Sequence, residues 1–224
     1  MSDLMIESRI QRKKLFYVFL IGITIIISSI GLFFLIESIK PKGPGVNWEK
    51  PAIYLYPREK TKVKVSLSIN GEITVSDPEY NDGWSVIAYP NGTIEGGYNY
   101  LFYEARLNYL EDPLKGWCIK YNFLENWMDI ILIEMGLNND EKEEFKEFWL
   151  NFLPKTDYYL IKLMSKEYLE INWDLFIDPL PDIIIRILLT FKPSQNPLKI
   201  ENPVIISPKR TGFTVVEWGG TLLN

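Results

Sequence analysis

The clearest feature of the hydrophobic pattern is a stretch from residue 15 to residue 36 that holds no charged side chain. At about 1.5 Å per residue, a helix over this stretch would be roughly 33 Å long, enough to cross a hydrocarbon core of about 30 Å. The stretch is longer than the apolar part of a cleaved signal peptide, and no A-x-A cleavage pattern follows it. We therefore predict a single transmembrane helix over residues 15–36.

Basic residues are denser before this stretch than after it. They are Arg9, Arg12, Lys13 and Lys14 before it, and Lys40, Lys42 and Lys50 after it. Because basic residues favour the cytoplasmic side, residues 1–14 are predicted to form a cytoplasmic tail and the large domain to lie outside. Within the span, Thr24 and Ser28 form a small-xxx-small pair, a pattern that allows an oligomer through the transmembrane helix.

After the span the pattern changes to short runs of β-branched and aromatic residues separated by turns. Residues 37–50, rich in Pro and Gly, are interpreted as a linker, and residues 51–224 as a β-rich extracytoplasmic domain. The first strand is expected at residues 52–56. Residues 61–69 give the clearest alternation, with Val63, Val65, Leu67 and Ile69 on one face, and predict a strand with one buried face.

Asn70-Gly71 has the composition of a two-residue hairpin turn, but the phase of the flanking strands disagrees with one. Such a turn would point Ile73 and Val75 to the face opposite Val63 and Val65. Either the loop carries an extra residue, as in a bulge, or the two strands belong to different sheets. Further strands are expected at residues 84–89 and 98–107, the second with two apolar faces.

From residue 124 the apolar positions follow helical spacing and predict a helical hairpin over residues 122–153. Asn122 with Glu125 is a plausible capping box for the first helix, and Gly136 ends it. The second helix starts at Asn138 or Asn139 and is expected to bury Phe145, Phe148, Trp149 and Phe152. Its acidic first turns are interpreted as capping, which suits the helix dipole.

Strands are expected again at residues 158–164, 168–175, 183–191, 204–207 and 212–218. The third of these places every second residue from Ile183 to Phe191 on one apolar face, as a core strand does. The fold class predicted from this order is α+β: a mainly antiparallel β sandwich or barrel-like domain with an inserted helical hairpin.

Composition removes several classes of chemistry. The chain has 29 Asp and Glu against 24 Lys and Arg, an acidic balance that argues against nucleic acid as a partner. It has no histidine, which removes Ser-His-Asp and Cys-His catalysis and the usual zinc ligands. The single cysteine, Cys118, cannot form an internal disulfide. We expect neither a metal nor a cofactor.

The candidate catalytic residues are two carboxylates in aromatic strands, Glu104 and Glu217. Glycosidases use paired carboxylates of this kind, separated by about 5–10 Å. The simpler alternative is that Glu104 pairs with a nearby basic residue and that Glu217 lies at a strand end. Glu79 and Asp82 offer oxygen ligands for calcium, but Asn81-Asp82-Gly83 is first of all a turn.

The candidate binding residues are Trp84, Tyr103, Arg210 and Trp218. With Tyr54 and Tyr56, these aromatic side chains could provide a stacking surface for glycan, although packing in the core is the better explanation for them. Asn91-Gly92-Thr93 matches a glycosylation sequon, and a Pro-Asn-Gly turn explains the same residues.

Three motifs resemble a known family. Residues 50–57 read Lys-Pro-Ala-Ile-Tyr-Leu-Tyr-Pro, residues 80–84 read Tyr-Asn-Asp-Gly-Trp, and residues 210–220 read Arg-Thr-Gly-Phe-Thr-Val-Val-Glu-Trp-Gly-Gly. Together they resemble a family of uncharacterised prokaryotic envelope proteins with KPxIYLYP and RTGFTVVEWGG motifs. The resemblance covers roughly residues 50–220 and implies an envelope location but no activity. A transmembrane helix would set this chain apart from soluble or lipid-anchored relatives.

Two hypotheses about function arise from these patterns. The first is a single-pass membrane protein whose outer domain binds or scaffolds envelope proteins or glycans. The alternative is a carboxylate-dependent hydrolase that acts on cell-surface glycan. Activity lost in Glu104→Gln or Glu217→Gln would favour the alternative.

Overall fold

The computed structural model describes residues 45–206 and 208–224. The predicted cytoplasmic tail (1–14), the predicted transmembrane helix (15–36) and most of the predicted linker lie outside the described residues. Among the described residues, no helix has both the length and the apolar character that a membrane span needs. All the described residues belong to one compact unit, which begins at Gly43 and ends at Asn224.

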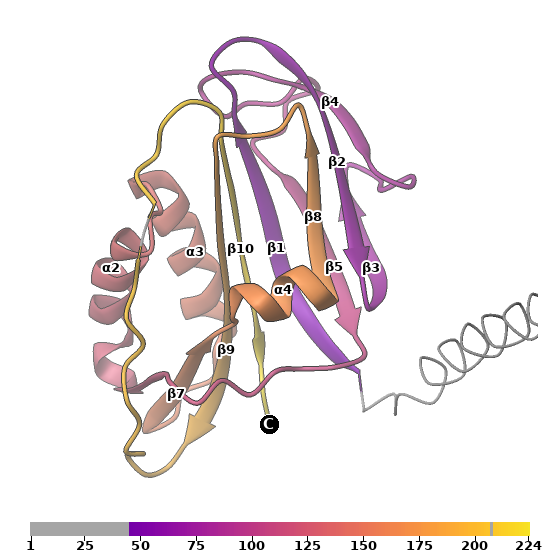
Figure 1. Cartoon of the computed structure of the whole chain (residues 1–224). Helices are drawn as coiled ribbons and strands as arrows, with labels where there is room; N and C mark the ends of the chain where they lie inside the picture. Colours follow the sequence, from indigo (N-terminus) through magenta and orange to yellow (C-terminus); the bar gives the residue numbers. More distant parts are fainter. Residues whose placement is uncertain (1–44, 207) are drawn as a thin grey trace, which may run out of the picture. The chain divides into compact units, whose positions relative to one another are not determined.

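The domain holds two β-sheets and three α-helices (Figure 1). The larger sheet has seven strands in the order β3-β5-β1-β10-β9-β7-β6. Their bounds are Val46–Tyr56 (β1), Gly71–Asp77 (β3), Leu101–Leu107 (β5), Trp117–Lys120 (β6), Tyr158–Leu163 (β7), Ile183–Ser194 (β9) and Thr214–Leu222 (β10). The smaller sheet has the order β4-β2-β8, with bounds Trp84–Ala88 (β4), Thr61–Ile69 (β2) and Trp173–Asp178 (β8).

Every strand pair is antiparallel except β9 with β10, which is parallel. The prediction of an α+β domain with mainly antiparallel strands is therefore confirmed. The barrel-like alternative is wrong for the described residues, because neither sheet closes on itself.

The two sheets explain the phase problem at Asn70-Gly71. β2 belongs to the smaller sheet and β3 to the larger one, so the second alternative drawn from the sequence is confirmed. The corner between them is held by two backbone hydrogen bonds, from Asn70 N–H to the carbonyl of Asn172 and from Asn108 N–H to the carbonyl of Asn70. Ile73 can thus face the core although it follows the turn in the wrong phase for a hairpin.

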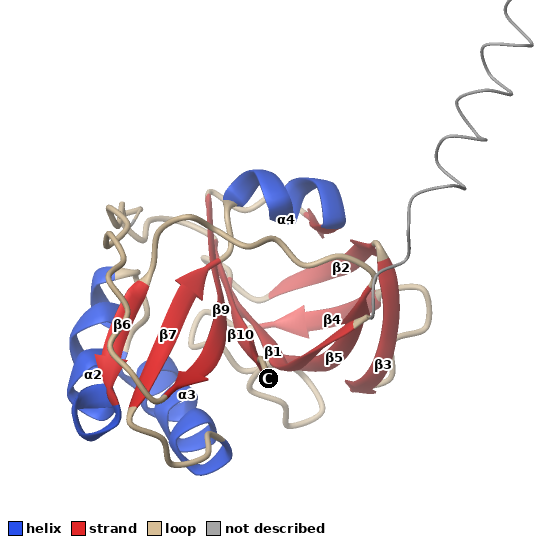
Figure 2. Cartoon of the chain, turned by 90° about the horizontal axis from the view of Figure 1, so that it is seen from below, coloured by secondary structure: helices blue, strands red, loops and turns tan. Residues whose placement is uncertain are grey.

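Two hydrophobic cores lie on opposite faces of the larger sheet. Alternate residues of β10 contribute to both cores, since Val215 belongs to one and Val216 to the other. The first, the intersheet core, packs the larger sheet against the smaller sheet and α4 (Lys166–Asn172). The second, the hairpin core, packs it against α2 (Leu124–Glu134) and α3 (Asn139–Phe152). Figure 2 shows the helical hairpin on one side of the larger sheet and the smaller sheet with α4 on the other.

The helical hairpin forms as predicted, with a change at its start. A short 3-10 helix, η1 (Tyr121–Phe123), precedes α2, and no side chain caps α2, so the proposed Asn122–Glu125 capping box is wrong. The capping box of α3 does form between Asn138 and Glu141. Gly136 has φ 105°, the left-handed conformation that ends a helix. Phe152, expected to be buried, is 42% exposed.

Three strand predictions need correction. Residues 166–172 form α4 instead of a strand, because the Ser165 hydroxyl accepts a hydrogen bond from Tyr168 N–H and caps a helix there. Residues 204–206 form no strand, and Val204 and Ile206 are strongly exposed; Ser207 lies outside the described residues. The strand β1 begins at Val46 and so includes the last residues of the predicted linker.

Candidate functional site

Glu104 and Glu217, the predicted carboxylate pair, lie on opposite faces of the larger sheet. The Tyr103 hydroxyl donates a hydrogen bond to Glu217, and both side chains are fully buried on the intersheet side. Because successive strand residues point to opposite faces, Glu104 faces the other way. The sheet backbone therefore separates the two carboxylates, and no pair of the glycosidase kind is formed by them.

Glu217 belongs to a buried polar network. Arg186, its neighbour on the parallel strand β9, donates from Nε to Glu217 Oε2 at 2.5 Å. Trp173 Nε1 donates to the Tyr103 hydroxyl at 2.6 Å. Burial, together with the Glu217 carboxylate, raises the pKa of Tyr103 well above its ordinary value, so this hydroxyl stays protonated and donates. The network links the two sheets; Glu217, Tyr103 and Trp173 are fully buried, and Arg186 borders a cavity between α4 and β9.

The predicted binding residues also have structural roles. Trp84, Tyr103 and Trp218 are buried, as is Tyr54, and the explanation by core packing is confirmed for them. Arg210 donates from both terminal nitrogens to the carboxylate of Glu141, and from Nε to the carbonyl of Gly136 at 2.8 Å. Arg210 thus fastens the loop before β10 to the helical hairpin.

The two turn motifs behave as turns. Asp82 (φ 57°) and Gly83 (φ 129°) adopt positive φ in the Asn81-Asp82-Gly83 turn. No group of three or more metal-ligating side chains occurs among the described residues. The Asn91 side chain accepts hydrogen bonds from Thr93 N–H at 3.2 Å and from the Thr93 hydroxyl at 2.8 Å, and these bonds hold the turn after Pro90.

A bulge in β1 creates the most distinctive site. The register of β1 shifts between Glu49 and Ala52 against β10, and at the same place against β5. Within the bulge Lys50 has φ 49°, a strained conformation for a residue with a side chain, and more so before a proline. Bulges re-aim side chains. Here the bulge presents Glu49 and Lys50 on the face of the sheet that also carries Tyr100 and Glu104.

Lys50 is held among aromatic rings. Its Nζ lies 5.3 Å from the ring centroid of Phe148, 5.6 Å from that of Tyr100 and 5.8 Å from that of Trp218. These distances fall within the range of cation–π attraction. No salt bridge engages the ammonium among the described residues, so the rings are its principal partners in the site.

A groove of about 630 Å³ lies beside Lys50, between α3 and the residues that directly precede β5. We call it the outer groove; it is lined by Lys50, Asn99, Tyr100, Glu144, Glu147, Phe148, Asn151 and Phe152. Glu144 is fixed at its inner side by a hydrogen bond from the Tyr54 hydroxyl, at 2.6 Å. Asn99, Glu147, Asn151 and Phe152 are exposed. The outer groove therefore combines aromatic faces with exposed amide and carboxylate groups, of which the Asn151 amide donates one hydrogen bond to the Glu147 carbonyl.

Glu49 and Glu104 form a second carboxyl pair on the same face. Burial, reinforced by the negative charge of Glu104, raises the pKa of Glu49 to about 7. The Oε2 atom of Glu49 is buried and has no hydrogen-bond partner among the described residues. Glu104 lies on β5, four residues after Tyr100, which comes directly before the strand. One carboxyl that holds its proton near neutral pH thus stands beside another.

Sequence reasoning found Glu104 but missed Glu49 and the role of Lys50. Both were assigned to the linker, because Pro41, Gly43, Pro44 and Gly45 dominate that stretch. The available signal was Trp48, a large apolar residue that a solvated linker seldom holds and that is fully buried here.

No family model, no curated protein and no solved structure matches this chain. The fold and the site together define an α+β domain with a polar, aromatic groove next to a carboxyl pair, and the function has to be inferred from these residues.

Proposed function

We propose that this chain is a membrane-anchored binding protein of the cell envelope that holds glycan in its outer groove. The observation that supports the proposal best is the lining of the groove, in which Tyr100, Phe148 and Phe152 lie among Asn99, Glu147 and Asn151.

The lining suits the two kinds of surface on a sugar. The C–H face of a pyranose ring is apolar and packs on an aromatic ring, while its hydroxyls both donate and accept hydrogen bonds. Phe152 is 42% exposed and offers such a ring. Glu147 and Asn151, one turn apart on α3, offer a carboxylate and an amide beside it.

The charge of the groove indicates which glycans fit. Lys50 is the one cation in the lining, and it stands against two carboxylates, Glu144 and Glu147. An acidic sugar would bring a third carboxylate to a site with one ammonium group. We therefore expect neutral and N-acetylated sugars to bind in preference to uronic acids.

The first test is binding of soluble oligosaccharides to the full chain in phospholipid nanodiscs, measured by calorimetry. Chitohexaose should bind and oligogalacturonate should not. Phe152→Ala should weaken binding about tenfold, because it removes an exposed stacking surface. The matched control is Phe176→Ala, since Phe176 is 53% exposed on β8, away from the groove. Equal affinities in both variants, or no binding of either sugar, would contradict the proposal.

A specific observation also favours hydrolysis as a second candidate, namely the raised pKa of Glu49 beside Glu104. A carboxyl protonated near neutral pH can donate its proton to a glycosidic oxygen while an ionised one assists the attack of water. Release of reducing ends from chitohexaose, lost in Glu49→Gln and in Glu104→Gln with binding retained, would establish this activity. Binding without release in the parent chain would leave the binding function alone.

The location is proposed from the sequence of residues 1–44. The uncharged stretch at 15–36 and the basic residues before it support an N-terminus in the cytoplasm and a domain outside the cell membrane. Protease added to intact cells should remove the domain and leave a tag at the N-terminus protected. A domain that is cleaved only after the membrane is opened would reverse this orientation.

A further inference from the structure

The strand β3 ends the larger sheet with an open edge. It pairs with β5 on one side, and within residues 45–206 and 208–224 no strand lies on its other side. None of the backbone hydrogen bonds between other segments of that part of the chain reaches residues 72–77. An edge of this kind presents N–H and C=O groups that a further strand can pair with.

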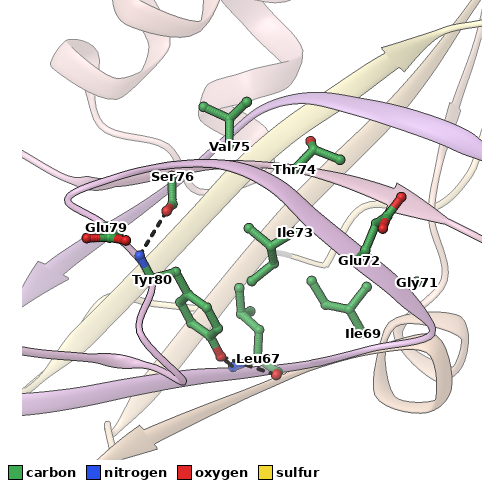
Figure 3. A pocket seen from close by; sticks show the side chains of 10 residues that line it. All are labelled: Leu67, Ile69, Gly71, Glu72, Ile73, Thr74, Val75, Ser76, Glu79 and Tyr80. Carbon is green, nitrogen blue, oxygen red and sulfur yellow. Dashed lines mark hydrogen bonds between the residues drawn. The ribbon is translucent and has the colours of Figure 1, made fainter.

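A cleft of about 470 Å³ lies along this edge. It exists because β2 and β3 enter different sheets after Asn70-Gly71 and diverge from each other. Figure 3 shows Leu67, Ile69 and Ile73 pointing into the space between the two strands, next to the ring of Tyr80, while Val75 points away from it. The cleft thus has an apolar floor beside an open strand edge.

Near Leu67, only the β3 side of the cleft has backbone groups that a further strand can pair with. The Tyr80 hydroxyl accepts a hydrogen bond from Leu67 N–H at 2.9 Å and lies 3.4 Å from the Leu67 carbonyl oxygen, to which it donates. It therefore occupies the backbone groups of β2 there. The backbone of β3 has no such cover among the described residues.

The charges around the cleft select the partner. Glu72 and Glu79 line it, and Asp77 ends the strand, all three exposed. A second copy of this chain is a poor occupant, because centred antiparallel pairing of two β3 strands sets Glu72 of one copy opposite Ser76 and next to Asp77 of the other, which brings like charges together. A basic segment meets opposite charge instead.

The length of the open edge limits the occupant as well. A bulge between Ile73 and Val75 interrupts the register of β3 with β5. Bulges shorten the regular part of an edge, so a docked segment can pair over only a few residues. A short extended peptide fits this edge better than a long strand does.

We propose that β3 binds a short, extended, basic segment of a partner protein by strand addition. The backbone of the segment pairs with the outer edge of β3. Its apolar side chains lie on Leu67, Ile69 and Ile73, and its basic side chains lie near Glu72 and Glu79. This surface is independent of the outer groove, so either proposal can fail without the other.

The test uses the full chain in nanodiscs and a fluorescein-labelled peptide of three Lys-Val repeats, followed by fluorescence anisotropy at physiological salt. The same peptide, N-methylated at alternate residues so that one edge cannot donate, should bind about tenfold more weakly. A peptide of three Glu-Val repeats should not bind. Equal binding of the methylated peptide would show attraction between charges alone and overturn the proposal.

Variants of the chain locate the site. Glu72→Lys with Glu79→Lys should weaken binding about tenfold, whereas Glu59→Lys with Glu95→Lys, also exposed acids, should leave the affinity unchanged. Hydrogen exchange of the amides in β3 should slow when the Lys-Val peptide is added. Protection of another segment with no change in β3 would place the peptide elsewhere and refute strand addition.

Discussion

The carboxyl of Glu49 shows what a bulge does at the scale of one residue. Glu49 pairs with Gly220 at the border of the bulge, and one of its side-chain oxygens is buried without a partner among the described residues. Burial then favours the neutral acid, and the nearby Glu104 adds to this preference. Glu49 therefore binds a proton more tightly in the folded chain than in the unfolded one.

This difference predicts how stability depends on pH. A raised carboxyl pKa lowers native stability as pH rises from about 4.5 to about 7, and the full loss persists above that range. Glu49→Gln removes the ionisable group, so the variant should match the parent near pH 4 and exceed its free energy of unfolding at pH 8. The gain should be about 1–2 kcal/mol, because partial contact with water screens the effect. Urea denaturation at both pH values measures it.

A matched substitution separates this effect from a general change of charge. Glu59 is exposed, and Glu59→Gln removes one carboxyl from the surface, so it should not reproduce the gain in free energy of unfolding expected of Glu49→Gln at pH 8. Parallel pH profiles for the parent and Glu49→Gln would show that Glu49 titrates normally.

Single residues also mark what the sequence could and could not predict about the site. Glu104 was found because a carboxylate in an aromatic strand is unusual in itself. Its partner was misassigned, because Glu217 has the same sequence context but lies on the other face, where Arg186 balances its charge and the Tyr103 hydroxyl donates a hydrogen bond to it. Which face a strand residue occupies depends on register across the sheet, and register is set by contacts distant in sequence.

At the scale of elements, the helical hairpin and the larger sheet share one core. Phe145 and Trp149 of α3 pack with Trp218 and Phe191 of the sheet, with ring centroids 5.2 Å apart for Phe145 and Trp218 and 4.7 Å apart for Trp149 and Phe191. All four side chains are fully buried. The hairpin is therefore part of the domain core and does not form a core of its own.

Truncation of Trp149 should consequently destabilise the whole domain. Trp149→Ala should lower the free energy of unfolding by about 3–5 kcal/mol, the range for large aromatic side chains removed from a core. Helix and strand signals in circular dichroism should be lost in one transition at a lower denaturant concentration.

The control for this prediction lies on the same helix. Phe152→Ala, at a position 42% exposed, should cost less than about 1 kcal/mol. Loss of the helices in Trp149→Ala ahead of an unchanged strand transition would show instead that the hairpin unfolds on its own.

Periodicity predicted most elements, and it failed where a local hydrogen bond competes with it. Residues 61–69 alternate cleanly, residues 183–191 have one wholly apolar face, and both form strands because these faces meet a core. Residues 166–172 form α4 because Ser165 caps a helix, and a window that begins at Tyr168 misses the cap. The phase conflict at Asn70-Gly71 was informative, because one of its two explanations was that the flanking strands belong to different sheets, and they do.

At the scale of the molecule, the strand order could not be predicted from the sequence. Antiparallel neighbours are usually close in the chain, but β1 lies between β5 and β10, and β10 pairs in parallel with β9. The polar network of Glu217, Arg186 and Tyr103 depends on this order, because its members come from three different strands. Long-range strand pairing therefore determines both the topology and which of the predicted site residues lie together.

The place of β10 has a consequence for how the chain is made. β10 joins β1 on one side and β9 on the other, so the two halves of the larger sheet meet only through residues 214–222. A ribosome supplies these residues after all the other strands, and until then β1 and β9 both expose an unpaired edge. Such edges associate readily with other chains. The nascent chain is therefore prone to associate with other chains until β10 is synthesised and pairs with both β1 and β9.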